Sequence, residues 1–148
     1  MQSARGERHF IGGAVVAGLI GLGALLTAPP ALAGASCHYP LCSETYNKAN
    51  HGVSVARNWC GNAQRLSQEI PPCGPGAQII RLNPGVHTNA REDWDAFQVN
   101  GDCVVQYQIY SSIARHMFAL QTIDRRGGGS QWVRVHNDQT AYIRSISC

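Results

Sequence analysis

The stretch 94–110, WDAFQVNGDCVVQYQIY, decides the fold. Apolar and polar residues alternate on both sides of Asn100-Gly101, and this period of two is typical of half-buried β-strands. Asn-Gly is the strongest short hairpin signal, because both residues tolerate the positive φ of a tight turn. The stretch therefore predicts strands over Trp94–Val99 and Cys103–Tyr110, joined as a hairpin. One face of the second strand carries Cys103, Val105, Tyr107 and Ile109.

Five further segments are predicted as short strands, and turn residues separate them. These segments are Val53–Trp59, Ala77–Leu82, Ile113–Ile123, Trp132–Val135 and Ala141–Arg144. Asn83-Pro84-Gly85 predicts a type II turn, with Pro at its second and Gly at its third position. No long helical period interrupts the series, although short helices also fit Ser43–Lys48 and Ala63–Ile70. The predicted fold class is all-β: a small disulfide-stabilised sandwich or barrel of about seven short antiparallel strands.

The N-terminus has the layout of a secretory signal. Arg5 and Arg8 precede an apolar run over Phe10–Thr27, and Ala31-Leu32-Ala33 places small residues where signal peptidase cleaves. A retained membrane anchor is the alternative, because this run could just span a bilayer. Its five glycines weaken that alternative. We therefore predict a signal peptide at 1–33 and a secreted, extracellular mature chain.

All six cysteines follow the predicted signal: Cys37, Cys42, Cys60, Cys73, Cys103 and Cys148. Export and an even count favour disulfides over zinc, and no cysteine pair has the close spacing of a zinc site. Six cysteines allow 15 pairings. The simplest expectation is Cys37–Cys42, Cys60–Cys73 and Cys103–Cys148.

The mature chain divides into a disulfide-pinned N-terminal arm at 34–50 and a single β domain at 51–148. A chain of this length buries roughly two-thirds of its unfolded surface, which is enough for one modest core. Without Arg5, Arg8 and Glu7 it keeps ten basic and eight acidic residues. This mild charge does not demand nucleic acid or a membrane as a partner, and we expect neither. We also expect no cofactor and no metal.

Three polar groupings were weighed as sites of chemistry. Asp93 and Asp95, with the Asn100–Asp102 turn, could supply oxygens to calcium, but edge and turn polarity around a buried Trp94 explains them as well. His87 with Glu92, or His116 with Arg115, could be drafted for a small nuclease, although their spacing matches no motif. No Gly-x-Ser-x-Gly elbow indicates a serine hydrolase. We therefore predict no catalytic residues.

Basic and aromatic residues gather toward the C-terminus and could form a partner-binding surface. The candidates are Arg125, Arg126, Trp132, Arg134, Tyr142 and Arg144. The alternative is a solvated hairpin with isolated arginines. Trp59, Trp94 and Trp132 fit the core better than a ligand site, because each lies within an alternating strand.

Two resemblances bear on function. Trp132–Val135 followed by Thr140–Arg144 resembles the closing hairpin of bacterial SH3-like domains, with Ala141 in place of the usual Gly. This resemblance implies a non-catalytic module that binds cell-wall peptide or protein. Arg57–Cys60, Pro84-Gly85 and Asp93–Phe97 resemble small secreted proteins of high-GC filamentous bacteria. One such group is the adaptor subunit of umbrella-shaped antibacterial toxin particles, which links a toxin stalk to a lectin-bearing subunit.

Together these features predict a non-enzymatic, secreted protein-binding module, an adaptor subunit of an extracellular toxin complex. Its partner would be another secreted protein, held through a strand edge or a cleft, or a cell-wall polymer. A peptidase inhibitor is the second hypothesis, because the Cys60–Cys73 loop with Pro71-Pro72 could present Arg65 or Leu66 to a protease. A small secreted nuclease is the third.

Cleavage of the signal is directly testable. Intact-mass measurement of the protein secreted by an expressing host is expected to show a chain that begins at Gly34. Recovery of the chain with residues 1–33 still attached, in the membrane fraction, would instead support a retained anchor.

Overall fold

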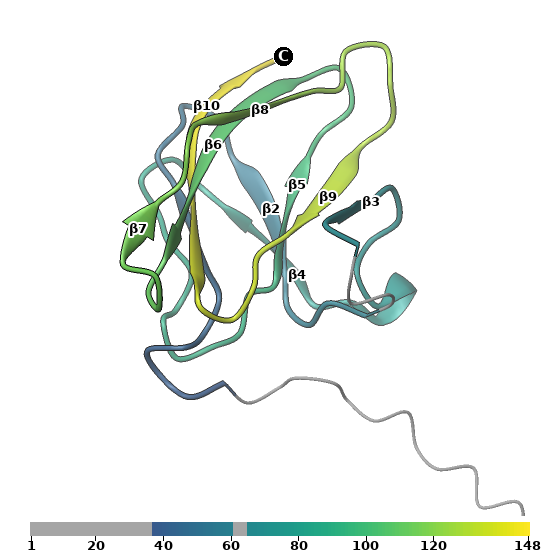
Figure 1. Ribbon diagram of the computed structural model, residues 1–148. Coiled ribbons are helices and arrows are strands. Elements are labelled where there is room, and N and C mark those ends of the chain that lie inside the picture. The colour runs from purple at the N-terminus through teal and green to yellow at the C-terminus, as the bar shows by residue number, and fades with distance from the viewer. Residues whose placement is uncertain (1–36, 61–64) are drawn as a thin grey trace, which may run out of the picture. The chain divides into compact units, whose positions relative to one another are not determined.

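The computed structural model describes residues 37–60 and 65–148, which fold as two packed β-sheets (Figure 1). The sheets are named here by their central strands, β6 and β5. The β6 sheet contains β1 (Glu44–Asn47), β10 (Gln139–Ser147), β6 (Val104–Ser111), β7 (His116–Met117) and β8 (Gln121–Asp124). The β5 sheet has the order β3 (Ser67–Gln68), β9 (Gln131–Arg134), β5 (Ala96–Val99), β2 (Val53–Ala56) and β4 (Ile79–Leu82). This confirms the all-β, disulfide-stabilised class and selects the sandwich.

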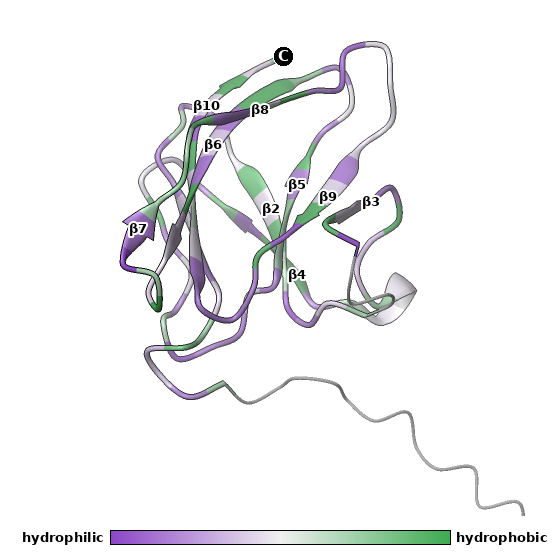
Figure 2. Cartoon of the chain, in the orientation of Figure 1, coloured by the Kyte–Doolittle hydropathy of each residue, from purple (hydrophilic) through white to green (hydrophobic). Residues whose placement is uncertain are grey.

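The core lies between the two sheets and is built from their alternating inner faces. Along β6 every second residue is buried, as the sequence predicts. Phe97 on β5 meets Tyr107 on β6 edge to face, with ring centroids 5.0 Å apart. Figure 2 shows hydrophobic and hydrophilic segments alternating along β5 and β9 of the facing sheet. Burial of these apolar faces is the main term that favours folding.

A second, smaller apolar cluster lies on the outer face of the β5 sheet. It contains Ala56, Trp59, Ala96 and Trp132. The guanidinium of Arg134 lies 5.9 Å from the Trp59 ring. Trp94 belongs to the main core. The prediction that all three tryptophans pack internally is confirmed, because each is at most 7% exposed.

The expected hairpin at Asn100-Gly101 is wrong. β5 pairs with β2 and β9, whereas β6 pairs with β7, β8 and β10, so the turn carries the chain from one sheet to the other. The residue with positive φ is Asp102, at 62°. A Cβ on Gly101 would lie 2.7 Å from the carbonyl oxygen of Gly128, so the absence of a side chain there permits a close backbone approach.

The hairpin implied by the SH3-like resemblance is also absent. β9 lies in the β5 sheet and β10 in the β6 sheet, and the Asn137-Asp138 turn between them is a second crossing. Sequence periodicity does not report which sheet receives a strand, so it does not distinguish a hairpin from a crossing between sheets. By contrast, the type II turn is confirmed. Gly85 has φ 80°, and the Val86 N–H donates to the Asn83 carbonyl at 3.1 Å.

Part of the expected N-terminal arm is an integral strand. Residues 44–47 form β1, which pairs in parallel with β10, in place of the helical turn expected over Ser43–Lys48. The side chains of Thr45 and Asn47 point into the core and are fully buried. Their polarity concealed the strand, but Asn47 is satisfied there by donating to the carbonyls of His51 and Leu82.

Two other segments also differ from expectation. Ile113–Ile123 is extended only from His116 onward, because residues 112–115 form a turn, and the extended part is split into β7 and β8 around Phe118–Leu120. The possible helix over Ala63–Ile70 is contradicted from residue 65 onward, where β3 is extended, and its first residues lie outside the described part of the chain.

The three disulfides have the expected pairing: Cys37–Cys42, Cys60–Cys73 and Cys103–Cys148. The last bridge joins the start of β6 to the residue after β10. Three disulfides are typical of extracellular proteins. In the ranges that the structure describes, no helix has the length and apolarity to cross a membrane.

The two sides of the sandwich differ. On one side, residues 85–88 run beside β1: Gly85 N–H donates to the Asn47 carbonyl at 2.7 Å, and Asn47 N–H to the Val86 carbonyl at 2.9 Å. This segment joins the β4 side of one sheet to the β1 edge of the other. The opposite side, between β9 and β6, contains a cleft, and there the sheets are joined through the connections at the two ends of β9, residues 125–130 and 135–138.

Loss of a disulfide is expected to destabilise in proportion to the loop that it closes. The Cys103–Cys148 bridge spans 45 residues and the Cys37–Cys42 bridge spans 5. On a chain-entropy basis their loss costs about 4 and about 2 kcal/mol. Urea unfolding of the two paired Cys→Ser variants measures this order. Equal losses, or the reverse order, would contradict it.

Candidate functional site

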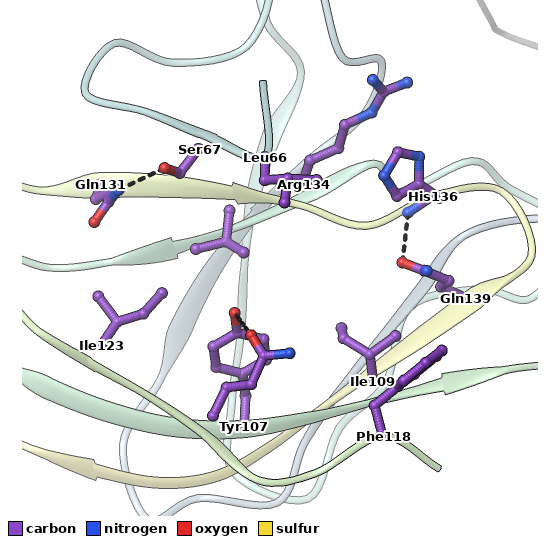
Figure 3. A pocket seen from close by; sticks show the side chains of 12 residues that line it. Leu66, Ser67, Tyr107, Ile109, Phe118, Ile123, Gln131, Arg134, His136 and Gln139 are labelled. Atoms are coloured by element: carbon purple, nitrogen blue, oxygen red, sulfur yellow. Dashed lines mark hydrogen bonds between the residues drawn. The ribbon is translucent and has the colours of Figure 1, made fainter. Parts of the chain in front are cut away.

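The cleft on the open side of the sandwich is the first candidate site (Figure 3). It has a volume of about 440 Å³, within the range of ordinary ligand pockets. β6, β8 and Phe118, which follows β7, supply one wall, and β3, β9 and the β9–β10 turn supply the other. In Figure 3, Tyr107, Ile109, Phe118 and Ile123 face Leu66, Gln131 and His136 across the gap.

The floor of the cleft is apolar. Ile109, Ile123 and Val133 line it and belong to the core or pack against it. Leu66 and Phe118 line it as well and remain 64% and 40% exposed, respectively. An apolar floor with exposed apolar side chains at its margin favours insertion of an apolar group from a partner.

Polar groups stand around this floor and are held in place. The Tyr107 hydroxyl donates to Gln121 Oε1 at 2.5 Å, and burial raises the pKa of this phenol, so Tyr107 stays a donor. Gln131 Nε2 donates to Ser67 Oγ at 2.7 Å. The backbone N–H of His136 donates to Gln139 Oε1 at 3.2 Å.

The second candidate is the free edge of β4, on the far side of the β5 sheet. β4 pairs with β2 and with no other strand of the described chain. Ile79 and Ile80 point to opposite faces and are 41% and 39% exposed. An exposed edge with apolar side chains on both faces is a template for pairing with another strand.

The register shows which backbone groups this edge presents. Arg57 N–H donates to the Gln78 carbonyl at 3.0 Å, so these two form a hydrogen-bonded pair of the β2–β4 ladder. Pairs alternate in an antiparallel ladder, so Ile80 and Leu82 also bond inward. The N–H and C=O groups of Ile79 and Arg81 therefore point outward, toward solvent.

Other edges are covered, polar or short. Residues 85–88 lie along β1, and β3 has two residues. The same alternation points Thr122 and Asp124 of β8 outward. Arg81, the one charged residue of β4, lies beside Gly52, where a Cβ would be 2.5 Å from its Nε. Its guanidinium thus leans back over the sheet and leaves the edge open.

The six basic and aromatic candidates lie in three places. Arg125 and Arg126 are in the β8–β9 connection, where Arg126 is paired with Asp124. Trp132 and Arg134 lie on the outer face of the β5 sheet, with Trp132 buried. Tyr142 and Arg144 lie on the outer face of the β6 sheet. β9 and β10 belong to different sheets, so the side chains of Trp132 and Arg134 do not form one surface with those of Tyr142 and Arg144.

Tyr142 and Arg144 have partners that the sequence did not indicate. The parallel pairing of β1 with β10 places Tyr46 beside Tyr142, with ring centroids 6.0 Å apart. Lys48 Nζ lies 4.8 and 5.0 Å from the two ring centroids, and Arg144 lies 5.2 Å from that of Tyr142. These cations cover the ring faces, which disfavours stacking of a sugar on them.

Asp93 and Asp95 come together, but around Ser43. The Ser43 hydroxyl lies 2.7 Å from Asp93 Oδ1 and 2.9 Å from Asp95 Oδ1, and Trp59 N–H donates to Asp95 Oδ2 at 2.8 Å. Burial, and then the Asp93 charge, raise the pKa of Asp95, against hydrogen bonds that lower it. The Ser43 hydroxyl thus lies within donor distance of both carboxylates and can donate its proton to only one of them at a time.

Asp102 lies elsewhere, accepting from the Gly127 N–H at 3.1 Å. Across 37–60 and 65–148, no three His, Cys, Asp or Glu side chains are grouped to hold a metal ion.

The histidines considered for catalysis have other neighbours. His87 packs edge-on against Tyr46 and its Nδ1 lies 2.8 Å from the Thr88 carbonyl, whereas Glu92 accepts from Trp94 Nε1. His116 packs against Phe118. In the Cys60–Cys73 loop, residues 61–64 lie outside the described chain. Arg65 and Leu66 are exposed, and the Leu66 carbonyl accepts from the Arg134 N–H.

Comparison with known proteins adds no family. No protein-family model, curated protein or solved structure matches this chain. The site must therefore be interpreted from its own geometry.

The buried Asp95 predicts a pH dependence of stability. Its folded pKa exceeds its unfolded value of 3.8, so the folded state binds more protons between the two values. The unfolding free energy therefore falls as pH rises through this window, by up to about 1.4 kcal/mol per pH unit. Asp95→Asn is expected to flatten this slope in urea unfolding measured from pH 3 to pH 7. An unchanged slope would assign it to other groups.

Proposed function

We propose that this protein is a secreted, non-enzymatic protein-binding module, an adaptor subunit of an extracellular complex, and that it holds a partner protein by strand addition at β4. The observation that carries the proposal is the β4 edge itself. It offers two outward N–H and C=O sets, from Ile79 and Arg81, between two exposed isoleucines.

The partner segment is an extended strand with alternating β-branched residues. Its backbone would pair with Ile79 and Arg81, and its side chains would cover Ile79 on one face and Ile80 on the other. Main-chain hydrogen bonds supply affinity in this mode, and the alternate side chains supply specificity. β2 already forms such a ladder on the inner side of β4, where Val55 stands opposite Ile80.

Rigidity supports the same role. A binding edge is effective when its strand is ordered before the partner arrives, because less conformational entropy is then lost. The ladder to β2 fixes β4, and the type II turn at Pro84-Gly85 fixes the chain that follows it. The Cys60–Cys73 bridge restrains the loop that precedes it.

The outward direction of the Ile79 N–H allows a direct test of strand addition at β4. Ile79→Pro removes an outward N–H and leaves the β2–β4 ladder intact, so the variant should fold with nearly unchanged Tm. It should no longer bind a peptide copied from residues 52–58 of this chain, an alternating strand of the proposed kind. The measurement is hydrogen exchange: the peptide should slow exchange at Ile79 and Arg81 in the unmodified protein.

Two matched variants complete the experiment. Thr122→Pro removes an outward N–H from the polar β8 edge and should bind the peptide normally. Ile80→Pro removes an inward ladder bond and should lower Tm, which verifies the assigned direction. Equal peptide binding by Ile79→Pro, or unchanged exchange at Ile79 and Arg81, would overturn strand addition at β4. If a second copy of this chain occupies the β4 edge, sedimentation at rising concentration will show dimers. That result would also contradict an adaptor that binds its partner at this edge.

A further inference from the structure

We propose that the inter-sheet cleft is a second binding site, which takes a neutral peptide segment and buries one branched apolar side chain of that segment between Ile109, Ile123 and Val133. This site goes beyond strand addition at β4 and does not depend on it, because different strands build it.

The cleft fits an apolar side chain in size and lining. Its volume of about 440 Å³ exceeds that of a single side chain and leaves room for the flanking main chain. Ile109 and Val133 are core residues, so their positions are fixed by packing on the side away from the cleft. An inserted aliphatic group would exchange water for contacts with these side chains and with the exposed Leu66 and Phe118 at the margin.

Three glutamines define the polar chemistry of the ligand. Each is anchored through one end of its amide: Gln121 and Gln139 through Oε1, and Gln131 through Nε2. The opposite ends meet no partner within 37–60 and 65–148, which leaves two NH₂ donors and one carbonyl acceptor at the cleft. A peptide main chain offers the complementary set, carbonyl acceptors and an N–H donor, beside each side chain.

The charge of the lining also favours a neutral ligand. Among the residues that the structure describes, no carboxylate lines the cleft, and Arg134 is the one permanently charged residue of its lining. In Figure 3 the Arg134 side chain extends away from the floor, and its guanidinium lies over Trp59. A charged group on the floor would lose hydration without gaining an opposite charge. The ligand is therefore the interior of a peptide and not a charged terminus.

The cleft and the β4 edge lie at opposite ends of the β5 sheet, whose strand order is β3-β9-β5-β2-β4. β9 and β3 form a wall of the cleft, and two strands separate β9 from β4. A partner strand on β4 therefore leaves the cleft open, so the module can hold two protein segments at once.

The test uses the purified protein with its disulfides intact and the tripeptide Ac-Ala-Leu-Ala-NH₂. Two-dimensional ¹H–¹⁵N NMR is expected to show saturable shifts of the side-chain NH₂ groups of Gln121 and Gln139, with no change at Ile79 or Arg81. Ac-Ala-Gly-Ala-NH₂ lacks the apolar group, and Ac-Ala-Lys-Ala-NH₂ carries a charge in its place. Both should bind at least tenfold more weakly.

Variants locate the site. Gln121→Ala and Gln139→Ala are each expected to weaken binding by about fivefold, as for loss of one neutral hydrogen bond. Gln106→Ala, on the outer face of the same sheet, where Gln106 Oε1 accepts from the Ser145 hydroxyl, is the matched control and should bind normally. Ile123→Trp should fill the cleft and abolish binding while Tm and the disulfides are retained.

Two results would overturn the proposal. One is the absence of shifts at Gln121 and Gln139 up to the solubility limit of the leucine peptide. The other is equal binding of the glycine peptide, which would remove the apolar insertion. Neither result bears on strand addition at β4, because Ile79→Pro leaves the cleft unchanged and should bind the leucine peptide normally.

Discussion

The rest of the structure depends on the contact between Phe97 and Tyr107 across the two sheets. Phe97 is fully buried at the centre of β5, and the Tyr107 ring meets it from the middle of β6 at 5.0 Å. This pair sets the separation of the sheets at the core. The Tyr107 ring belongs to the core while its hydroxyl reaches the cleft and holds Gln121. The same side chain therefore joins the packing that stabilises the fold to the polar arrangement of the candidate site.

The path of the chain explains why the two sides of the sandwich differ. The chain crosses between sheets at Gly101, again after β8, and again at Asn137-Asp138, so strands that follow one another rarely pair. On the β1 side, residues 85–88 bridge the sheets with backbone hydrogen bonds. On the β9 side, the sheets are joined by the connections at the two ends of β9, residues 125–130 and 135–138, and the cleft lies between β9 and β6. The β4 edge is left free because the chain turns away from it at Pro84-Gly85.

Polar groups buried in this small protein are arranged to secure the N-terminal segment. The Ser43 hydroxyl is a donor within reach of both Asp93 and Asp95, and Asn47 satisfies two carbonyls and one N–H inside the core. An unsatisfied buried polar group is costly, so these contacts hold β1 in one register against β10. That register in turn places Tyr46 and Lys48 beside Tyr142. The cations that cover Tyr46 and Tyr142 on the outer face of the β6 sheet are therefore positioned by the buried amide of Asn47 and the buried hydroxyl of Ser43.

The sequence by itself determined the class and most of the strands, and the structure has the simplest of the disulfide pairings that the sequence allows. Period-two alternation specified the buried face of β6, and Pro84-Gly85 specified the type II turn after β4. Both signals are local in the sequence. Only the tertiary structure decided which strands pair. β1 was hidden by its polar residues, and the hairpin expected at Asn100-Gly101 became a crossing because both strands find better partners elsewhere. The cleft was invisible for the same reason: Gln121, Gln131 and Gln139 are ordinary polar residues in sequence, and they become a set only when the two sheets face each other across the open side.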